Sequence, residues 1–557
     1  MARPRLSAVV MTHPRRRAAA EKLALSVPGG PLRVVMDPDP TGTPSVLRTA
    51  LAAWSSIEEG ATHHMVVQDD MVLSETFLDR VREAIGELPD AALALFALWD
   101  SRNGAAVRMG AMAGARWVGA VNEYFPCVAI VLPRRVAEGF VGYGRQRLGG
   151  WPDDILMHRY LRAHDVPRYV AVPNLAEHED RGSISGNAFR GPRRSVCFVP
   201  GDRPAQEGRT LTGLSVLPFF KHGVAQCAVR VTGPGPERWL HLDAEQYLRG
   251  AGLPETLLRP PGSGASGALG ACAADVRGTW LTALAMGFGA ARAGLAVPSG
   301  TSEAYTEAVA TIGTGGISNA STEEHLARRR APLAEVAHRA LDAGREAADE
   351  RRVRPRRPGG PVWRGAENPL GEHLVRRLAD LRERSAAVID LTALGSPGPR
   401  VTVRPPGEPV PYTLRVGELY GPGCSRRSPV GRMVWDALRS QPVVAGGDPD
   451  AEVWPVYVND LADAIAAVLR ARPEAREMSA VPGKPCTAAE LAQAVHDAVR
   501  PVPVRPEPGA DPGWQCPATA PRPPGWAPAT DLARGLHAFA QWLAYEEAPR
   551  TVTSSAG

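Results

Sequence analysis

The sequence predicts an α/β protein built around parallel β-sheet. Two observations carry this prediction: strand-like and helix-like segments alternate through residues 1–195, and the same alternation resumes from Asn368. Strands that alternate with helices favour a parallel sheet, and ligands of such sheets bind beyond the carboxyl ends of the strands. With 557 residues, of which 44% are hydrophobic and 22% charged, the chain can form two large units or three to four smaller ones.

The first 195 residues contain three β-rich runs with helical segments between them. Residues 6–12, 33–36 and 63–67 are predicted strands, each ending in polar residues. Residues 16–25 and 45–57 show the apolar spacing of amphipathic helices. This part of the chain is therefore predicted to form a parallel α/β sheet.

A long helical region follows, before a break in the pattern. Residues 267–294 are rich in Ala and Gly and predict one or two buried helices. Ser321 and Glu324 fit a capping box that opens a charged helix, with a restart at Pro332. Residues 354–361 are rich in Pro and Arg and are expected to form an exposed linker.

The α/β pattern then resumes. Leu374, Leu378 and Leu381 mark an amphipathic helix, and residues 387–391 and 413–416 predict two strands. Residues 196–260 carry no pattern that predicts their structure.

Composition and charge exclude several classes of protein. A net charge of +5 is too dilute to indicate binding to nucleic acid or to an anionic membrane. The seven Cys contain no C-x-x-C pair, so neither a disulfide framework nor a structural zinc site is expected. Apolar runs stay far below the ~18 residues that span a bilayer, and no signal peptide is visible. We therefore expect a cytoplasmic protein.

The strongest local signal is an acidic pair at the end of a predicted strand. Residues 63–67 run directly into Gln68, Asp69 and Asp70. Mg²⁺ and Mn²⁺ prefer oxygen ligands and often share their coordination shell with a substrate phosphate. The alternative is a turn that caps the helix beginning near Ser74.

Two further groups carry possible chemistry. Trp151-Pro152-Asp153-Asp154 opens a helical segment, where a carboxylate serves either as a simple cap or as a catalytic base. His178 follows a predicted strand and is either a third metal ligand or an ordinary loop residue.

The order of these pieces resembles a GT-A-type glycosyltransferase, of the family 2 or 25 kind, over about residues 5–190. The resemblance rests on T-H-P-R after the first strand, Asp37, Q-D-D, W-x-D-D and P-N-x-x-x-H. It implies a nucleotide-sugar donor, an acceptor that the sequence does not identify, and Mn²⁺ or Mg²⁺ as cofactor.

The resemblance also assigns roles to single residues. Thr12, Arg16, Asp37 and Asp69 are implied donor-binding residues. Asp70 and His178 are implied metal ligands, and Asp153 and Asp154 stand where an inverting enzyme keeps its general base. The motif is Q-D-D rather than D-x-D, so one carboxylate is expected to bind the metal while the other serves the ribose or supports the site.

A second resemblance covers about residues 264–545 and is densest at 413–469. R-x-x-x-x-Y-G-P-G ends at Gly423, Q-P-V-V-A-G-G ends at Gly447, and W-P-V-Y-V-N-D-L-A-D-A-I ends at Ile465. These segments are similar to extended short-chain dehydrogenases, the NAD-dependent nucleotide-sugar epimerases and dehydratases. The resemblance implies a Rossmann-like module.

That module lacks the catalytic pair of active members. The chain holds three Lys, and Ala18, Leu217 and Ala480 stand four positions before them, so no Tyr-x-x-x-Lys exists. Without the Lys, a Tyr phenol is not tuned for proton exchange near neutral pH.

The glycine loop of the module is also incomplete as a cofactor site. Gly264, Gly267 and Gly270 have the spacing of a dinucleotide loop, but Pro260 and Pro261 precede them where a strand is needed. The sequence therefore argues against NAD(P) binding.

These observations predict a metal-dependent glycosyltransferase with a degenerate, non-catalytic second module. The expected domains are a GT-A-like domain at 1–195, a connecting region at 196–261, an epimerase-like domain at 262–547 and a disordered tail at 548–557. Two alternatives stay open: a nucleotide-sugar epimerase or dehydratase, and a non-enzymatic scaffold or nucleotide sensor. A homodimer is expected by analogy, with no nucleic-acid partner and no membrane span.

Overall fold

The computed structural model divides the chain into two compact units. The first comprises residues 1–248 and 253–353, and the second comprises 354–548 together with 249–252. The structure describes residues 4–27, 29–42, 45–148, 151–179, 191–203, 207–231, 238–261, 272–295, 302–349, 361–380, 387–395, 398–507, 513–514 and 520–545. Each unit is α/β, which confirms the predicted fold class at this level.

The first unit is organised around an eight-stranded mixed sheet with the order β10-β6-β8-β5-β7-β3-β1-β2. Its strands are β1 (Leu6–Thr12), β2 (Arg33–Met36), β3 (His63–Gln68), β5 (Ala92–Ala94), β6 (Trp117–Gly119), β7 (Ala129–Pro133), β8 (Arg168–Ala171) and β10 (Thr210–Leu211). Strand β1 is parallel to β2 and β3, whereas β7 is antiparallel to both β3 and β5. The start of β7 therefore lies at the same edge as the ends of β1 and β3.

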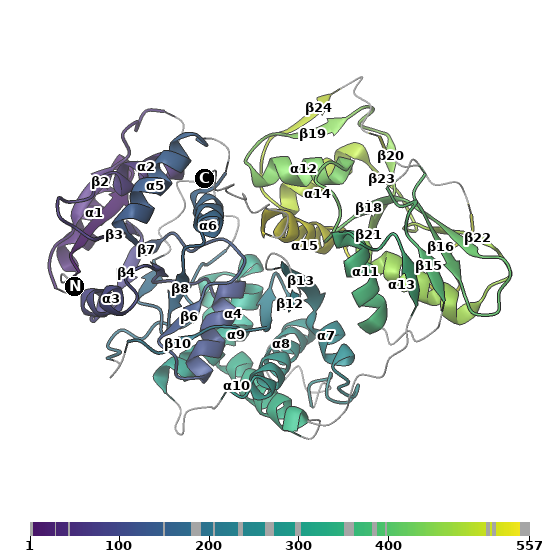
Figure 1. Cartoon of the computed structure of the whole chain (residues 1–557), viewed down its shortest axis with the longest axis horizontal. Coiled ribbons are helices and arrows are strands. Elements are labelled where there is room, and N and C mark those ends of the chain that lie inside the picture. Colours follow the sequence, from purple (N-terminus) through teal and green to yellow (C-terminus); the bar gives the residue numbers. More distant parts are fainter. Residues whose placement is uncertain are drawn as a thin grey trace, which may run out of the picture. The chain divides into compact units, whose positions relative to one another are not determined.

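Helices cover both faces of this sheet (Figure 1). They are α1 (Arg17–Ser26), α2 (Val46–Trp54), α3 (Phe77–Glu87), α4 (Arg102–Met112), α5 (Arg134–Arg145) and α6 (Asp153–Ala163). Met65 and Val67 pack into one core cluster with α1 and α3. The alternate residue His64 points to the opposite face, where its ring meets Trp54 of α2. A buried sheet of this kind needs apolar side chains on both faces, as the sequence of β3 provides.

A three-stranded antiparallel sheet lies in the region whose structure the sequence did not predict. It contains β11 (Val216–Lys221), β12 (Val224–Val231) and β13 (Arg238–Asp243). Strands β11 and β12 are joined by the two residues His222 and Gly223, which both have positive φ values of 51° and 72°. Two left-handed residues form the turn that matches the twist of a tight hairpin.

Three long helices pack together, and the first two of them also contact this small sheet and α4 (Figure 1). They are α8 (Ala273–Arg292), α9 (Glu303–Ile317) and α10 (Glu323–Asp349). The contacts place these helices in the first unit, whereas we expected residues 262–547 to form a single module. Arg108 of α4 shows why, because its buried guanidinium donates to the carbonyl of Ala308 and the hydroxyl of Thr311 on α9.

The start and the course of α10 differ from the expectation. Thr322, not Ser321, caps the helix, since the Thr322 hydroxyl accepts from the backbone N–H of His325 at 3.2 Å. Ser321 instead donates its hydroxyl to the carbonyl of Ile317. The helix also continues through Pro332 without a restart.

Helices α8 and α10 cross backbone to backbone. A Cβ at Gly287 would collide with the carbonyl of Leu341, and a Cβ at Gly344 would collide with the carbonyl of Leu284. Glycine at both positions therefore permits the close approach.

The second unit has a five-stranded mixed sheet with the order β14-β15-β16-β17-β22. Its strands are β14 (Val362–Arg364), β15 (Val388–Asp390), β16 (Arg400–Arg404), β17 (Tyr412–Val416) and β22 (Glu477–Ala480). Strand β16 is antiparallel to both β15 and β17.

Short strand pairs and helices complete this unit (Figure 1). The pairs are β18 (Glu418–Tyr420) with β21 (Pro455–Tyr457), β19 (Val443–Gly446) with β24 (Val504–Glu507), and β20 (Glu452–Val453) with β23 (Cys486–Thr487). The helices are α11 (Pro369–Asp380), α12 (Pro429–Leu438), α13 (Val458–Ala471), α14 (Ala488–Ala498) and α15 (Leu532–Tyr545). They share one apolar core with the sheet.

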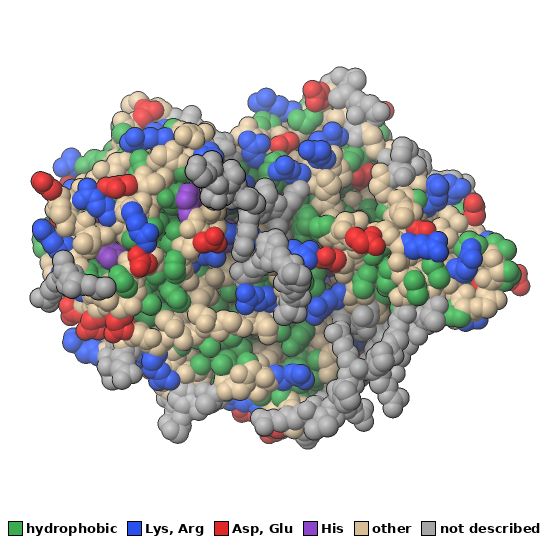
Figure 2. All heavy atoms as spheres, viewed as in Figure 1, with side chains coloured by type: hydrophobic (Ala, Val, Ile, Leu, Met, Phe, Trp, Pro, Cys, Tyr) green, Lys and Arg blue, Asp and Glu red, His purple; other side chains and the backbone are tan. Residues whose placement is uncertain are grey.

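The surface carries both signs of charge. Basic and acidic side chains are interspersed over the face shown in Figure 2. Among the described helices, none is long and apolar enough to cross a bilayer.

Candidate active site

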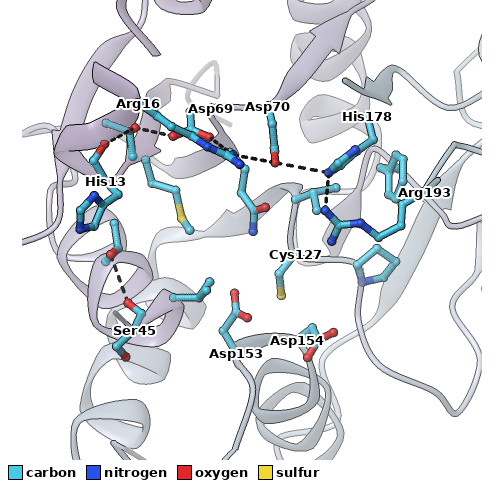
Figure 3. A pocket seen from close by; sticks show the side chains of 18 of the residues that line it. His13, Arg16, Ser45, Asp69, Asp70, Cys127, Asp153, Asp154, His178 and Arg193 are labelled. Carbon is cyan, nitrogen blue, oxygen red and sulfur yellow. Dashed lines mark hydrogen bonds and ion pairs between the residues drawn. The ribbon is translucent and has the colours of Figure 1, made fainter. Parts of the chain in front are cut away.

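The first unit holds a cavity of about 220 Å³ at the edge where β1, β2 and β3 end (Figure 3). The eight residues to which the GT-A resemblance assigns roles all line it: Thr12, Arg16, Asp37, Asp69, Asp70, Asp153, Asp154 and His178. Parallel strands bring residues that are distant in sequence to one edge of the sheet, which explains this convergence. Their individual roles stay predictions.

Arg16 joins the two carboxylates that follow β3. It lies in a short 3₁₀ helix directly after β1, and its Nη1 is 3.1 Å from Asp69 Oδ1 and 3.0 Å from Asp70 Oδ2. The hydroxyl of Thr12, the last residue of β1, donates to Asp69 Oδ2. Charge-assisted hydrogen bonds of this kind hold the acidic pair in a fixed geometry.

The pKa values of the two carboxylates are shifted in opposite directions. Burial raises the pKa of Asp69 above its ordinary value, and the hydrogen bonds from Thr12 and Arg16 offset only part of that rise. Burial alone would also raise the pKa of Asp70, but His178 and Arg16 together bring it below its ordinary value. Asp70 is therefore the more firmly ionised member of the pair.

His178 and Arg193 extend the row of polar side chains across the cavity (Figure 3). Strand β9 (Ala176–His178) pairs with β4 (Met71–Leu73), so the chain after Asp70 fixes the position of His178. His178 Nε2 is 3.3 Å from Asp70 Oδ2 and 3.2 Å from Arg193 Nη2.

The two residues that follow Arg193 are anchored to β9 and to α10. The carboxylate of Glu177 accepts from the backbone N–H and the hydroxyl of Ser195. Arg194 donates to the carbonyl of His178 and pairs with Glu323 of α10. These contacts of Arg194 and Ser195 hold the neighbouring Arg193 beside the cavity.

Asp153 lies on the opposite wall and faces the cavity (Figure 3). It begins α6, is half-buried, and stands next to Asp154. Burial and the negative charge of Asp154 raise the pKa of Asp153 to about 7. Asp154 Oδ1 accepts from the backbone N–H of the next residue, Ile155, at 2.7 Å. Of the two, Asp153 has the properties of a general base near neutral pH.

Asp37 lines the cavity, but its carboxylate is already engaged. Arg48 of α2 donates to both of its oxygens, at 2.7 and 2.8 Å, and the backbone N–H of Asp39 donates to one of them. These hydrogen bonds hold the pKa of Asp37 below its ordinary value. Both oxygens of Asp37 thus have a protein donor, so it is better suited to shape the site than to bind a ligand directly.

Arg193 and Cys127 are among the polar residues of the cavity that the sequence did not indicate. Arg193 lies in a Gly-Pro-Arg-Arg segment that has no periodicity and no motif, so the sequence carried no signal for it. Cys127 enters the cavity because antiparallel β7 begins at this edge. Burial and two aspartates raise the pKa of the Cys127 thiol well above its ordinary value, which argues against a nucleophilic thiolate.

The described residues do not fit the expected divalent metal. They contain no group of three or more His, Cys, Asp or Glu side chains placed to hold a metal ion. The position between the two carboxylates is taken by the Arg16 guanidinium, which excludes a second cation at close range.

The glycines of the expected dinucleotide loop, Gly264, Gly267 and Gly270, lie outside the residues that the structure describes. In the second unit, the parallel pairing of β18 with β21 places Tyr420 beside Tyr457. Burial raises the pKa of Tyr420 well above its ordinary value.

Comparisons with known proteins gave matches among solved structures alone: no protein-family model and no curated protein matches the chain. The UDP-glucose 4-epimerase of Thermus thermophilus, solved with NAD, is 23% identical, with 23% of this chain and 45% of that chain covered and a TM-score of 0.20. The dTDP-glucose 4,6-dehydratase of Bacillus anthracis, also solved with NAD, is 20% identical, with 24% and 44% covered and a TM-score of 0.21.

A third similar structure is the UDP-N-acetylglucosamine 4-epimerase of Methanobrevibacter ruminantium, in complex with UDP-N-acetylmuramic acid. It is 19% identical, with 23% of this chain and 44% of that chain covered and a TM-score of 0.21. The chain thus spans less than half the length of these structures. Two of the three are nucleotide-sugar epimerases and one is a dehydratase, so none of them is a glycosyltransferase.

These findings correct the predicted cofactor. The expectation of Mn²⁺ or Mg²⁺ without NAD(P) is wrong, because the similar structures include enzymes that hold NAD. The GT-A assignment of residues 1–195 stays a prediction.

Proposed function

We propose that the first unit binds a nucleotide-sugar in the cavity and transfers its sugar to an acceptor hydroxyl. The observation that supports this most is the arrangement of Asp153 and Arg16 on opposite walls. A carboxylate with a pKa of about 7 can remove a proton from an alcohol in the transition state. The guanidinium groups of Arg16 and Arg193 supply positive charge for a departing diphosphate.

The proposed step balances as a single displacement. The acceptor oxygen forms a bond to the anomeric carbon of the sugar while its proton passes to Asp153. The bond between that carbon and the diphosphate oxygen breaks, and the electron pair leaves with the nucleoside diphosphate. No oxidant or reductant takes part.

The test is a transfer assay on the full chain. UDP-, GDP- and dTDP-sugars are incubated with a panel of sugar and polyol acceptors, and release of nucleoside diphosphate is matched to glycosylated product by mass spectrometry. We expect Asp153→Asn to lower the transfer rate by about 10²- to 10⁴-fold while donor binding stays.

Asp79→Asn is the matched control, because Asp79 is an exposed carboxylate in the first turn of α3 in the same unit. It should change the rate by less than twofold. Release of free sugar without product would indicate hydrolysis, and unchanged activity in Asp153→Asn would contradict the assigned base.

A second candidate is a nucleotide-sugar epimerase or dehydratase that uses NAD in the second unit. It is favoured by the strand pairing that brings the R-x-x-x-x-Y-G-P-G segment against the segment containing Tyr457. The absence of Tyr-x-x-x-Lys from the whole chain stands against it. Incubation with NAD⁺ and UDP-glucose or dTDP-glucose distinguishes the two: a C4 epimer or a keto-sugar would establish the second candidate.

A further inference from the structure

Arg16 takes the position that a divalent cation would need. One nitrogen of its guanidinium contacts both Asp69 and Asp70, and its side chain is 16% exposed and lines the cavity. The arrangement is built by two elements, because β1 delivers Arg16 and β3 delivers the acidic pair. The acidic pair is thus already neutralised in part by the chain itself.

His178 Nε2 has two hydrogen-bonding neighbours, and a neutral imidazole cannot form a hydrogen bond with both of them through this atom. Arg193 can only donate to Nε2, whereas ionised Asp70 can only accept from it, and both lie within 3.3 Å. If Nε2 carries the proton, it can donate to Asp70, but the N–H group of Arg193 then points at another hydrogen-bond donor. An anion beside Arg193 resolves this conflict, since Arg193 then donates to the anion and His178 to Asp70.

Two buried polar atoms of the same side chains also favour a bound ligand. Within the described residues, Asp70 Oδ1 and His178 Nδ1 have no hydrogen-bond partner, although Asp70 and His178 are 7% and 2% exposed. An unsatisfied buried polar atom is costly, so a bound molecule with hydroxyl and anionic groups would stabilise this wall.

We propose that Arg16 and Arg193 bind the diphosphate of the donor in place of a divalent metal ion, so that donor binding requires no added cation. This inference rests on the proposed function and names the groups that recognise the donor. Guanidinium groups match phosphate oxygens in pairs of parallel hydrogen bonds, and they keep their charge at all relevant pH values.

Calorimetry with UDP, GDP, dTDP and inorganic pyrophosphate tests the proposal, with each titration carried out in EDTA and again in Mn²⁺. We expect the wild type to bind one of the nucleotides with affinities that agree within twofold in the two buffers. Arg16→Ala and Arg193→Ala should each weaken that affinity at least tenfold. Arg17→Ala is the matched control, because Arg17 is the next residue, is 63% exposed and pairs with Glu21.

Arg16→Ala leaves two buried carboxylates without their shared cation, so thermal unfolding must show that the variant is folded. Arg16→Lys keeps the charge but loses the planar fork, and we expect it to fold and to bind several-fold more weakly than the wild type. Affinity in EDTA that is equal in Arg16→Lys, Arg193→Ala and the wild type would overturn the proposal.

The remaining outcomes separate this inference from the proposed function. Binding that appears only with Mn²⁺ would overturn the inference and leave glycosyl transfer standing. Absence of binding to every nucleotide in both buffers would overturn the proposed function and the inference together.

Discussion

Two aspartates in the first turn of a helix, one in each unit, show how similar positions serve different purposes. Asp153 opens α6 and Asp460 lies in the first turn of α13, and burial raises the pKa of both. Asp460 accepts from the backbone N–H groups of Ala529 and Thr530 and from the Thr530 hydroxyl, at 3.0 to 3.4 Å. Asp153 instead faces the cavity, and its backbone donors are its own N–H and that of Asp154.

A raised pKa alone therefore does not identify a functional carboxylate. The origin of the hydrogen-bond donors decides the matter, because donors from a distant segment cover the carboxylate, whereas the local backbone donors of Asp153 leave it facing the cavity. By this criterion Asp37, which is held by Arg48, resembles Asp460, although it lines the same cavity as Asp153.

The largest expected effect is that of Asp153→Asn on the pH dependence of transfer, and it tests whether Asp153 differs from Asp460 in function. We expect kcat/KM of the wild type to rise with pH through about 7, as Asp153 loses its proton. Asp153→Asn should lose about 10²- to 10⁴-fold at pH 8 and show no rise at this pH. A pH–rate profile from pH 5 to 9 measures both, and a rise that persists in the variant would assign it to another group.

The same substitution should stabilise the protein at neutral pH. The pKa of Asp153 is raised in the folded state, so its contribution to stability is present in acid and is lost as the pH rises through about 7. Denaturant unfolding should therefore show the difference between Asp153→Asn and the wild type growing from pH 4 to pH 7. A difference in stability that stays constant with pH would mean that the pKa of Asp153 is not raised in the folded state.

Asp460→Ala should have the opposite effects to Asp153→Asn: transfer is kept, and stability falls strongly. Removing the carboxylate leaves the buried donors of Ala529 and Thr530 unsatisfied, which costs about 3 kcal/mol. Chemical denaturation checks the loss, and transfer by the folded fraction should be retained. Loss of transfer in a folded Asp460→Ala protein would show that the two carboxylates are not different in kind.

Asp37→Ala should behave like Asp460→Ala, but with a smaller effect. Loss of the pair with Arg48 is expected to cost about 2 kcal/mol at neutral pH. Because the pKa of Asp37 is lowered in the folded state, this cost should shrink as the pH falls below about 4. Denaturation at pH 7 and pH 3 compares the two conditions, and equal losses would argue against an ionised pair.

Asp154→Asn should have the smallest effect. Removing the neighbouring charge should lower the pKa of Asp153, so the rising limb of kcat/KM is expected to move down by about one pH unit. A pH–rate profile that does not move would indicate that burial alone raises the pKa of Asp153.

Residues next to periodic elements could be found from the sequence, and residues whose role depends on tertiary contacts could not. Asp69, Asp70 and Asp153 follow a predicted strand or open a predicted helix, so their convergence follows from parallel topology. The engagement of Asp37 by Arg48 depends on how α2 packs against β2, which no local pattern shows.

The part of the fold that escaped prediction has a similar physical cause. The turn at His222 and Gly223 is the single local signal for β11 and β12, and a lone His-Gly is a weak sign of a hairpin. Helices α8 to α10 were expected as helices, but their sequence does not say which unit they join. That choice depends on side chains such as Arg108, which lies 200 residues before its partner Ala308 in the sequence.

The crossing of α8 and α10 has a consequence for how the chain can change over evolutionary time. At Gly287 and Gly344 the obstacle to a larger residue is the backbone of the facing helix, not a side chain. A compensating substitution to a smaller partner therefore does not exist at either position. The two sites must be retained as glycine together, or the helices must separate and the crossing must be rebuilt along its whole length.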